Sequence, residues 1–484
     1  MSLSGALSNA LSGLTAASRA AQVTASNLAN VMTEGYARRE LEVTSRSIGG
    51  YGGVQVMGVT RHVSPALISE RRMATSEQTA STRLADYFTR LETLVGTPDE
   101  GDSLTSRIAD FEASLVSAAS RPDLADRLNQ AVMDAGEVAA TFKKVSDGIQ
   151  TLRSEADREI ASTVERLNTS LSQVRDLNIQ ISNAIVNGHD TAALEDQRQL
   201  LIDGISEIVP VKEYKRDLGA VALFTPGGVA LVDGTAAELS FDATNVIVPH
   251  MTLDNGLLSG LEINGQPVDT ASSDGPISGG KLAALFQIRD ELAPESQSQL
   301  DAVARDLVER FQDAGLDATR ASGDAGLFTD GGAAFTAANE VGLAGRLEVN
   351  ALVDPDAGGA SWRLRDGLGA TTPGPVGESS LLLDLQGALS ALRVPASGDF
   401  GSTAQTAGNL QATFLGEIGS AREVSDQTVS FAAARYSAIN TQVLEDGVDS
   451  DQEMQNLLLI EQAYSANARM MQVVDEMMQT LMGI

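Results

Sequence analysis

The fold is decided by residues 450–484, which read SDQEMQNLLLIEQAYSANARMMQVVDEMMQTLMGI. Apolar residues in this stretch recur in steps of three and four, as at the a and d positions of a coiled coil, so it predicts one uninterrupted amphipathic helix. Ser450 and Glu453 match a capping box at its start, while Asp449 and Asp451 add negative charge at the positive end of the helix dipole. The predicted seam comprises Leu457, Ile460, Tyr464, Asn467, Met471, Val474, Met478 and Leu481.

This seam needs a partner, because an apolar stripe of about 25 residues, ~37 Å long, is not stable in water. Residues 1–31 follow the same spacing and predict the partner helix. We therefore expect residues 1–60 and 445–484 to form a terminal coiled-coil domain; the alternative is that the two helices merely close a helical domain. The N-terminal seam comprises Leu3, Leu7, Ala10, Leu14, Ala17, Ala21, Thr24, Leu28 and Val31. Its small residues bury little surface, so we expect the pair to be marginal within a single chain.

Helical periodicity continues through residues 61–210 and 280–444, which predict a helical rod domain with a loop-rich stretch near 323–402. One long helix is expected to carry a seam from Ile160 to Ile185 and to end at Asn187-Gly188, where the left-handed conformation of a helix C-terminus is accessible. The last helix of the rod, about residues 403–444, is expected to place one apolar face toward the bundle. That face comprises Leu410, Phe414, Ala421, Val424, Thr428 and Phe431.

Strand-like alternation replaces the helical period in two places. Residues 41–63 predict a long hairpin that turns at the glycine cluster 49–53, and residues 211–279 predict short strands separated by turns such as Asp233-Gly234. The expected fold class is mainly α with inserted β, which combines a terminal-helix coiled coil, a long-helix bundle and a small β domain inserted in the middle.

Composition excludes several classes of function. The 484 residues are enough for two to four domains. The chain has 65 acidic and 34 basic residues, which give a net charge of −31. This negative charge argues against a groove that binds nucleic acid and against an anionic membrane surface as partner. The absence of cysteine excludes disulfides, thiolate catalysis and cysteine-bound metals. We expect no membrane insertion, because no apolar run approaches 18 residues, and no cleaved signal peptide, because polar residues interrupt every early apolar run.

No catalytic motif is complete. Residues 275–281, GPISGGK, satisfy the spacing of a phosphate-binding loop, but Leu282 replaces the Ser or Thr that would hold magnesium and Pro276 removes an N–H. His62, His189 and His250 are isolated from one another in the sequence. We therefore expect no enzyme activity, no cofactor and no metal; a secreted enzyme with an active site in residues 211–400 is the alternative from a different class.

Short motifs at both ends carry a resemblance to a known family. Near the N-terminus stand SGL at 12–14, ASNLAN at 25–30 and GYAR at 35–38, and the C-terminal helix contains QAYSANA at 462–468. These stretches resemble the terminal helices of bacterial flagellar rod, hook and hook-associated axial proteins, whose ends form a coiled-coil domain. The residues that carry the N-terminal motif are Asn27, Asn30, Gly35 and Tyr36.

Two inner stretches narrow the resemblance. LEDQR at 194–198 and GKLAALFQIRD at 280–290 look like the first hook-associated protein family, which joins hook to filament. The resemblance implies an extracellular structural subunit in a ring of about eleven copies. It also implies export through the flagellar type III apparatus with a chaperone, contacts to the hook protein and the next hook-associated protein, and an outward-facing β domain. Flagellin, the hook protein and the third hook-associated protein are the alternatives within the axial class.

Overall fold

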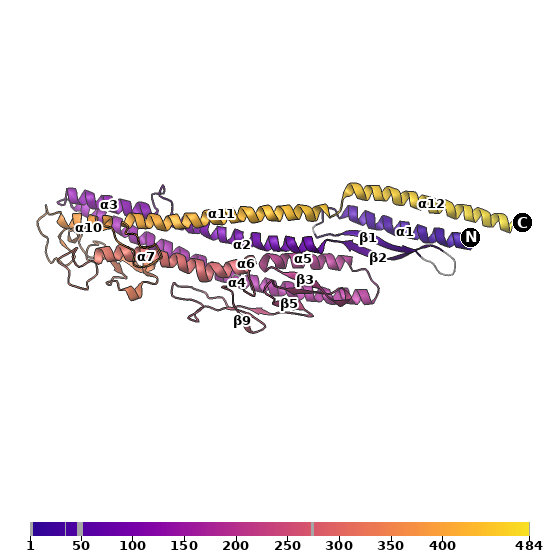
Figure 1. The fold of residues 1–484 in the computed structure, drawn as a ribbon. Helices are drawn as coiled ribbons and strands as arrows, with labels where there is room; N and C mark the ends of the chain where they lie inside the picture. Colours follow the sequence, from indigo (N-terminus) through magenta and orange to yellow (C-terminus); the bar gives the residue numbers. More distant parts are fainter. Residues whose placement is uncertain (1–2, 34, 46–51, 273–274, 484) are drawn as a thin grey trace.

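The computed structural model describes residues 3–33, 35–45, 52–272 and 275–483. It is an elongated helical rod with both chain ends at one tip (Figure 1). The expected fold class is confirmed, since helices dominate and a few small sheets are inserted among them. The helices of the rod are α2 (Pro65–Val95), α3 (Leu104–Ser120), α4 (Ala125–Val186), α5 (Ala192–Ile208), α6 (Gly280–Gln287), α7 (Ala293–Gln312), α8 (Leu343–Arg346), α9 (Arg363–Asp366), α10 (Ser380–Ser390) and α11 (Ala407–Glu445).

The tip is built from the two ends of the chain. Helix α1 (Leu3–Ala29) runs toward the rod, and α12 (Ser450–Met482) lies beside it and runs back to the tip (Figure 1). On its other side α1 packs against a hairpin of β1 (Arg38–Ser45) and β2 (Val54–His62), in which a bulge follows Glu42. The hairpin predicted at 41–63 is therefore present, while residues 49–51 of its predicted turn lie outside the described residues.

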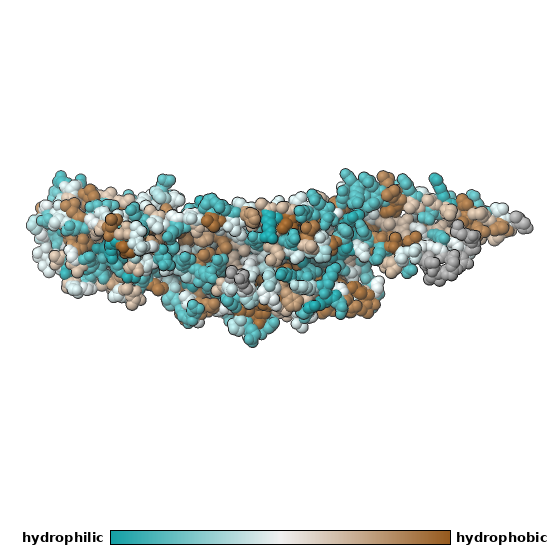
Figure 2. Space-filling model, in the orientation of Figure 1, coloured by the Kyte–Doolittle hydropathy of each residue, from teal (hydrophilic) through white to brown (hydrophobic). Residues whose placement is uncertain are grey.

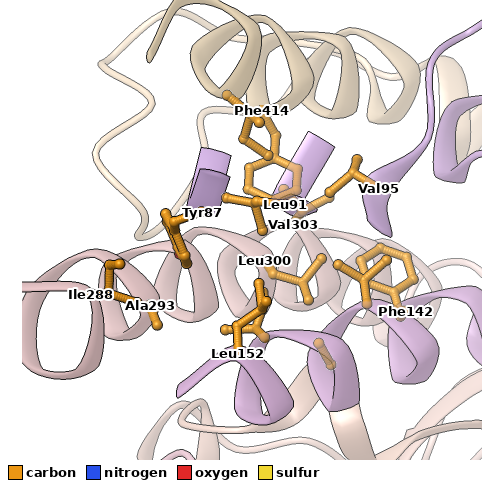
Figure 3. Packing of buried hydrophobic residues seen from close by; sticks show 14 of the residues in the cluster. Tyr87, Leu91, Val95, Phe142, Leu152, Ile288, Ala293, Leu300, Val303 and Phe414 are labelled. Atoms are coloured by element: carbon orange, nitrogen blue, oxygen red, sulfur yellow. The ribbon is translucent and has the colours of Figure 1, made fainter. Parts of the chain in front are cut away.

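Helix α4 forms the backbone of the rod. Its seam residues Ile160, Val164, Leu167, Leu171, Val174, Asn178 and Ile181 are buried, as their spacing predicts, while Ile185 at the end is 39% exposed. Side chains of α4 meet side chains of three other helices, α2, α7 and α11, in one core. Figure 3 shows this packing for Leu91, Phe142, Leu300 and Phe414. A π-helical turn, Ile288–Leu292, joins α6 to α7 in this core. The rod is therefore held by contacts between distant segments.

The predicted apolar face of α11 was correct at its start and wrong further on. Leu410 and Phe414 are buried, but Val424 and Phe431 are 60% and 69% exposed, and Ala432 is buried in their place. The reason is that α11 packs antiparallel to α2 through small residues on both helices, which allow the two backbones to approach closely. Large side chains beside that narrow contact therefore remain outside it.

The inserted β region lies directly on α4. It contains a sheet of β3 (Lys212–Lys215), β4 (Val221–Phe224), β5 (Ala230–Asp233) and β6 (Thr235–Ala236), and a sheet of β7 (Leu239–Ser240), β8 (Leu261–Ile263) and β9 (Gln266–Val268). The side chain of Asn178 donates to the carbonyl of Val221 and accepts from its N–H, and Asn168 does the same with Leu239. These two asparagines satisfy backbone groups that would otherwise be left without partners in a buried contact.

The stretch 323–402 contains only short elements. Strands β10 (Phe328–Asp330) and β11 (Leu347–Val349) pair antiparallel, and Phe111, Phe311 and Phe328 stack edge to face or tilted beneath them, with ring centroids 5.3 to 6.0 Å apart. This aromatic cluster ties the loops to α3 and α7, which explains why a segment with little regular structure is well packed.

Candidate assembly interface at the terminal helices

Gly13 of α1 faces Asn467 of α12 near the centre of the pair. A Cβ added to Gly13 would lie 2.8 Å from Oδ1 of Asn467, so a larger residue there would displace the asparagine side chain. The Asn467 side chain donates to the carbonyl of Ala463 at 2.9 Å, within its own helix. The polar residue in the predicted seam is thus accommodated by a glycine opposite and a hydrogen bond along α12.

The structure places most predicted seam residues on the facing sides of the two helices, only partly buried. Leu3, Leu7, Leu14, Leu28, Leu457, Ile460, Asn467 and Met471 are half-buried, and Val474 is buried. Tyr464, Met478 and Leu481 are exposed, so one α1 helix does not cover the whole stripe. The prediction that Val31 lies in the helical seam was wrong, because α1 ends at Ala29. The N–H of Asn30 bonds to the carbonyls of both Ser26 and Asn27, as is common at a helix end. Val31 lies in the following turn and is 41% exposed.

A second apolar stripe on α12 was missed by the sequence reasoning. It comprises Leu459, Ala463, Ala466, Met470, Val473 and Met477, all exposed. The residues of this second stripe recur in steps of four and three, as in the first seam, but each lies one residue earlier in the sequence. The second stripe is therefore rotated by about 100° around the helix axis from the first. The same periodicity search, repeated one residue out of phase, would have found it. Figure 2 shows hydrophobic residues gathered over this end of the molecule.

Asn27 fastens the end of α1 to β1. Its side chain is 1% exposed, donates to the carbonyl of Arg39 at 2.9 Å, and accepts from the N–H of Arg39 at 3.0 Å and from the hydroxyl of Tyr36 at 2.9 Å. The Arg39 guanidinium also lies over the Tyr36 ring, 4.8 Å from its centroid. Asn27 and Tyr36 therefore form a corner that sets the direction in which the chain leaves the helix.

The other two motif residues shape the turn after α1. Asn30 donates from its side chain to the carbonyl of Ser26, and its side-chain oxygen accepts from the hydroxyl of Thr33. Gly35 has φ of 75°, and a Cβ there would lie 2.5 Å from the side chain of Leu200 on α5. The turn thus requires glycine for two reasons, its left-handed backbone and its contact with the rod.

The joint between tip and rod is held by ion pairs around Asp196. This carboxylate accepts from Arg39 at 2.9 Å and from Arg61 at 2.8 Å, which links both strands of the hairpin to α5. A second pair, Arg38 to Glu453 at 2.9 Å, links β1 to the first turn of α12. The pairs on Asp196 therefore fix the tip to the rod, and the pair with Glu453 holds α12 to the hairpin within the tip.

The capping box predicted at the start of α12 was wrong. Asp449 is the N-cap, and its side chain accepts from the N–H groups of Asp451 and Gln452 at 2.8 and 3.1 Å. Glu453 is 2% exposed and its carboxylate pairs with Arg38. A buried carboxylate is more strongly stabilised by a guanidinium than by one backbone N–H. The Glu453 side chain therefore pairs with Arg38 and does not cap the helix.

The stretch 280–290 anchors the core of the rod. Gly280 has φ of 73° and opens α6 where a Cβ would lie 2.4 Å from the carbonyl of Ile208, and Lys281 pairs with Glu159 at 2.6 Å. The Arg289 side chain is completely buried between Asp157 and Asp290, each 2.8 Å away. The lysine of the phosphate-loop spacing is thus engaged in an ion pair on α4.

Over the described ranges, no group of three or more His, Asp or Glu side chains is arranged to hold a metal ion. Within the same residues, no helix combines the length and the apolarity that crossing a membrane requires.

Three family models match the parts of the chain just described. The model described as Flagella basal body rod protein matches residues 7–36, and the one described as Flagellar basal body rod FlgEFG protein C-terminal matches 445–484. Between them, the model described as Flagellar hook-associated protein FlgK helical domain matches 88–328. The terminal matches cover α1 from Leu7 onward, the turn that follows it as far as Tyr36, and all of α12. These findings define the chain as a flagellar axial protein.

Curated relatives narrow the class. The flagellar hook-associated protein 1 of Bacillus subtilis is 25% identical over 98% of this chain and 96% of its own length, and that of Escherichia coli is 24% identical over 67% of this chain and 59% of its own length. The chain is thus similar over nearly its whole length to a member of the flagellar hook-associated protein 1 family. A solved structure, that of the flagellar hook junction protein FlgK from Burkholderia pseudomallei, is similar with a TM-score of 0.45 and 22% identity over 55% of this chain and 47% of that one.

Proposed function

We propose that this chain is a structural subunit of the junction between flagellar hook and filament, and that it polymerises through its paired terminal helices. The observation that carries the proposal is the uncovered stripe on α12, on which Leu459, Met470, Val473 and Met477 are each 45% to 63% exposed. A long helix with a second heptad stripe is suited to bind another helix, because the stripe supplies the knobs of a further coiled-coil contact.

In this proposal the two stripes of α12 have different partners. The first faces α1 of the same chain, and the second faces a terminal helix of a neighbouring subunit. Completing the burial of four large apolar side chains contributes about 1 kcal/mol or more each, since a fully buried side chain of this size is worth roughly 1.5–3 kcal/mol. One subunit makes this contact with its neighbour, so the stabilisation is repeated around the assembly.

The parts of the chain have distinct places in the proposed assembly. Residues 1–60 and 445–484 form the inner coiled-coil domain, residues 61–210 and 280–444 form the surrounding rod domain, and residues 211–279 face outward. The subunits form a ring of about eleven copies that contacts the hook protein and the next hook-associated protein. The family resemblance supports these assignments, together with export by the type III apparatus with a chaperone, an extracellular location and a purely structural role without catalysis.

The test replaces one residue of the second stripe and one on the opposite face of the same helix. Met470→Asp places a charge without a partner in the proposed contact, whereas Gln472→Asp alters an exposed polar position two residues away. In a strain that lacks the native gene, we expect Met470→Asp to be exported but absent from isolated hooks and filaments. Gln472→Asp should be found at the hook–filament boundary by immunogold electron microscopy. Normal incorporation of Met470→Asp, or wild-type protein elsewhere than at this boundary, would refute the proposal.

A further inference from the structure

A cavity rich in cations lies at the joint between tip and rod. It has a volume of about 460 Å³ and is bounded by the end of β2, the start of α2, α5 and β3. In a protein of net charge −31 its lining is unusual, since five cations face two carboxylates, Glu195 and Glu213. The cations are Arg61, Arg72, Arg198, Lys215 and Arg216.

Three of these cations are neutralised within the chain and two are not. Arg61, Arg72 and Arg216 form ion pairs with carboxylates of Glu195, Asp196, Asp203, Glu213 and Asp233. Over the described residues, no carboxylate oxygen lies within 4.0 Å of a charged nitrogen of Arg198 or Lys215. Arg198 and Lys215 therefore lack a direct ion-pair partner among the described residues.

Arg198 is the more informative of the two. It is 7% exposed, and its Nη1 donates to two neutral acceptors, the side-chain oxygen of Asn178 at 2.9 Å and the carbonyl of Gly219 at 2.7 Å. Burial lowers the pKa of the Arg198 guanidinium, because desolvation disfavours its charge more than the nearby carboxylates favour it. A buried charge is normally paired, so an anion from outside the chain would complete this site.

The chain carries an acidic segment at the same level along the rod. The connection from α11 to α12 contains Glu445, Asp446, Asp449 and Asp451, all exposed. Asp449 caps α12, and among the described residues the other three carboxylates form no ion pair. Their charge is therefore available to a partner.

The cavity and this acidic connection lie near each other along the molecule. Val63, Ile68 and Gln199 line the cavity and also line a smaller one, of about 60 Å³, that Asp446 and Gly447 line. The two features thus share one level of the joint with a thin wall between them. Figure 1 shows the α11–α12 connection along the upper edge, and α5 and β3 below it. Copies standing side by side at one level would bring the connection of one copy near the cavity of the next.

We propose that the acidic α11–α12 connection of one subunit docks at the cationic cavity of the next subunit. This contact joins two different surfaces of identical chains, and a contact of this kind generates a ring when the rotation between neighbours closes. The inference rests on the proposed function, since it needs subunits side by side in the flagellum. It adds a charge-based contact at the joint to the apolar contact at the tip, and opposite charges favour one orientation and one level of neighbouring subunits.

Cross-linking tests the contact directly, because the chain has no cysteine of its own. Two variants, Lys215→Cys and Glu445→Cys, are produced together in one strain, and isolated flagella are treated with a short thiol-reactive cross-linker. We expect a covalent dimer in the mixed flagella and none in flagella with either variant alone, because the contact joins unlike surfaces. Asp99→Cys, in the exposed connection from α2 to α3, replaces Glu445→Cys in the control and should give no dimer with Lys215→Cys.

A charge exchange provides the second test. Lys215→Glu and Glu445→Lys should each weaken the contact about two- to fivefold per interface, which is the range for a surface ion pair, and should reduce swimming. The combination of both changes in one chain restores opposite charges at every interface, so we expect swimming to recover. Recovery in the double variant would support the inference, and additive loss would contradict it.

The two proposals fail differently. Wild-type protein that is absent from the hook–filament boundary would refute the proposed function itself. Protein that is present there, but gives no mixed dimer and responds to neither charge reversal, would refute only the docking of the acidic connection.

Discussion

The ion pair between Arg38 and Glu453 allows a sharp test of how the two ends of the chain are held together in the tip. The two residues are 415 positions apart, the charged atoms are 2.9 Å apart, and Glu453 is 2% exposed. Arg38→Ala would leave a buried carboxylate without its partner, which costs about 3–5 kcal/mol. Glu453→Gln would cost less, about 1–2 kcal/mol, because Arg38 retains the exposed Glu40 at 3.3 Å and Gln can still accept a hydrogen bond.

The assay is hydrogen exchange of the backbone amides at 454–456, the first amides of α12 that bond within the helix. Loss of about 3 kcal/mol of local stability should accelerate exchange there roughly a hundredfold or more in Arg38→Ala. The double variant Arg38→Ala with Glu453→Gln should recover part of this loss, since no unpaired charge remains. A capping role for Glu453 predicts that both single variants are nearly silent, because a cap does not use Arg38 and glutamine also serves in a capping box. Unchanged exchange in Arg38→Ala would therefore refute the ion-pair argument.

Three further predictions concern the ends and the core. Leu14→Asp or Met471→Asp should abolish incorporation into flagella while the rod keeps its thermal transition; wild-type motility in either variant would contradict this. Limited proteolysis of the dilute monomer should trim residues 1–31 and 457–484 to a stable core, because the terminal pair buries few large side chains, and resistant ends would argue against order coupled to assembly. Burial raises the pKa of Asp301 to about 6 from 3.8, so the stability that this group contributes is complete below pH 4 and is lost as the pH rises through 6. Asp301→Asn should reduce the change in unfolding free energy between pH 4.5 and 7 by about 2 kcal/mol, measured by denaturant titration; parallel pH profiles would contradict this.

The elements with strong local signals were predictable from the sequence. The period of α12 and of the α4 seam, the turn at Asn187-Gly188 and the hairpin after α1 follow from spacing and from residues with restricted or permissive backbones, which act over a few positions. The terminal motif was recognisable for a related reason. Asn27 and Tyr36 meet within nine positions, so the corner that they build is encoded in one short stretch.

The tertiary structure alone decided which faces and charges meet. A heptad pattern gives the period of an apolar stripe but does not identify the helix that covers it. Helix α12 carries two stripes of equal periodicity, and only the fold shows that α1 covers one of them. Helix α11 packs against the small buried residues of α2 with a different face from the one that its large apolar residues predicted. Glu453 pairs with Arg38 instead of capping α12 as the local sequence had predicted. The lack of a carboxylate partner for Arg198 follows from the packing of α5 against α4 and the β region, where this side chain bonds to Asn178 and Gly219. Pairings of this kind depend on the free energy of burying side chains from distant segments together, and no local pattern records that quantity.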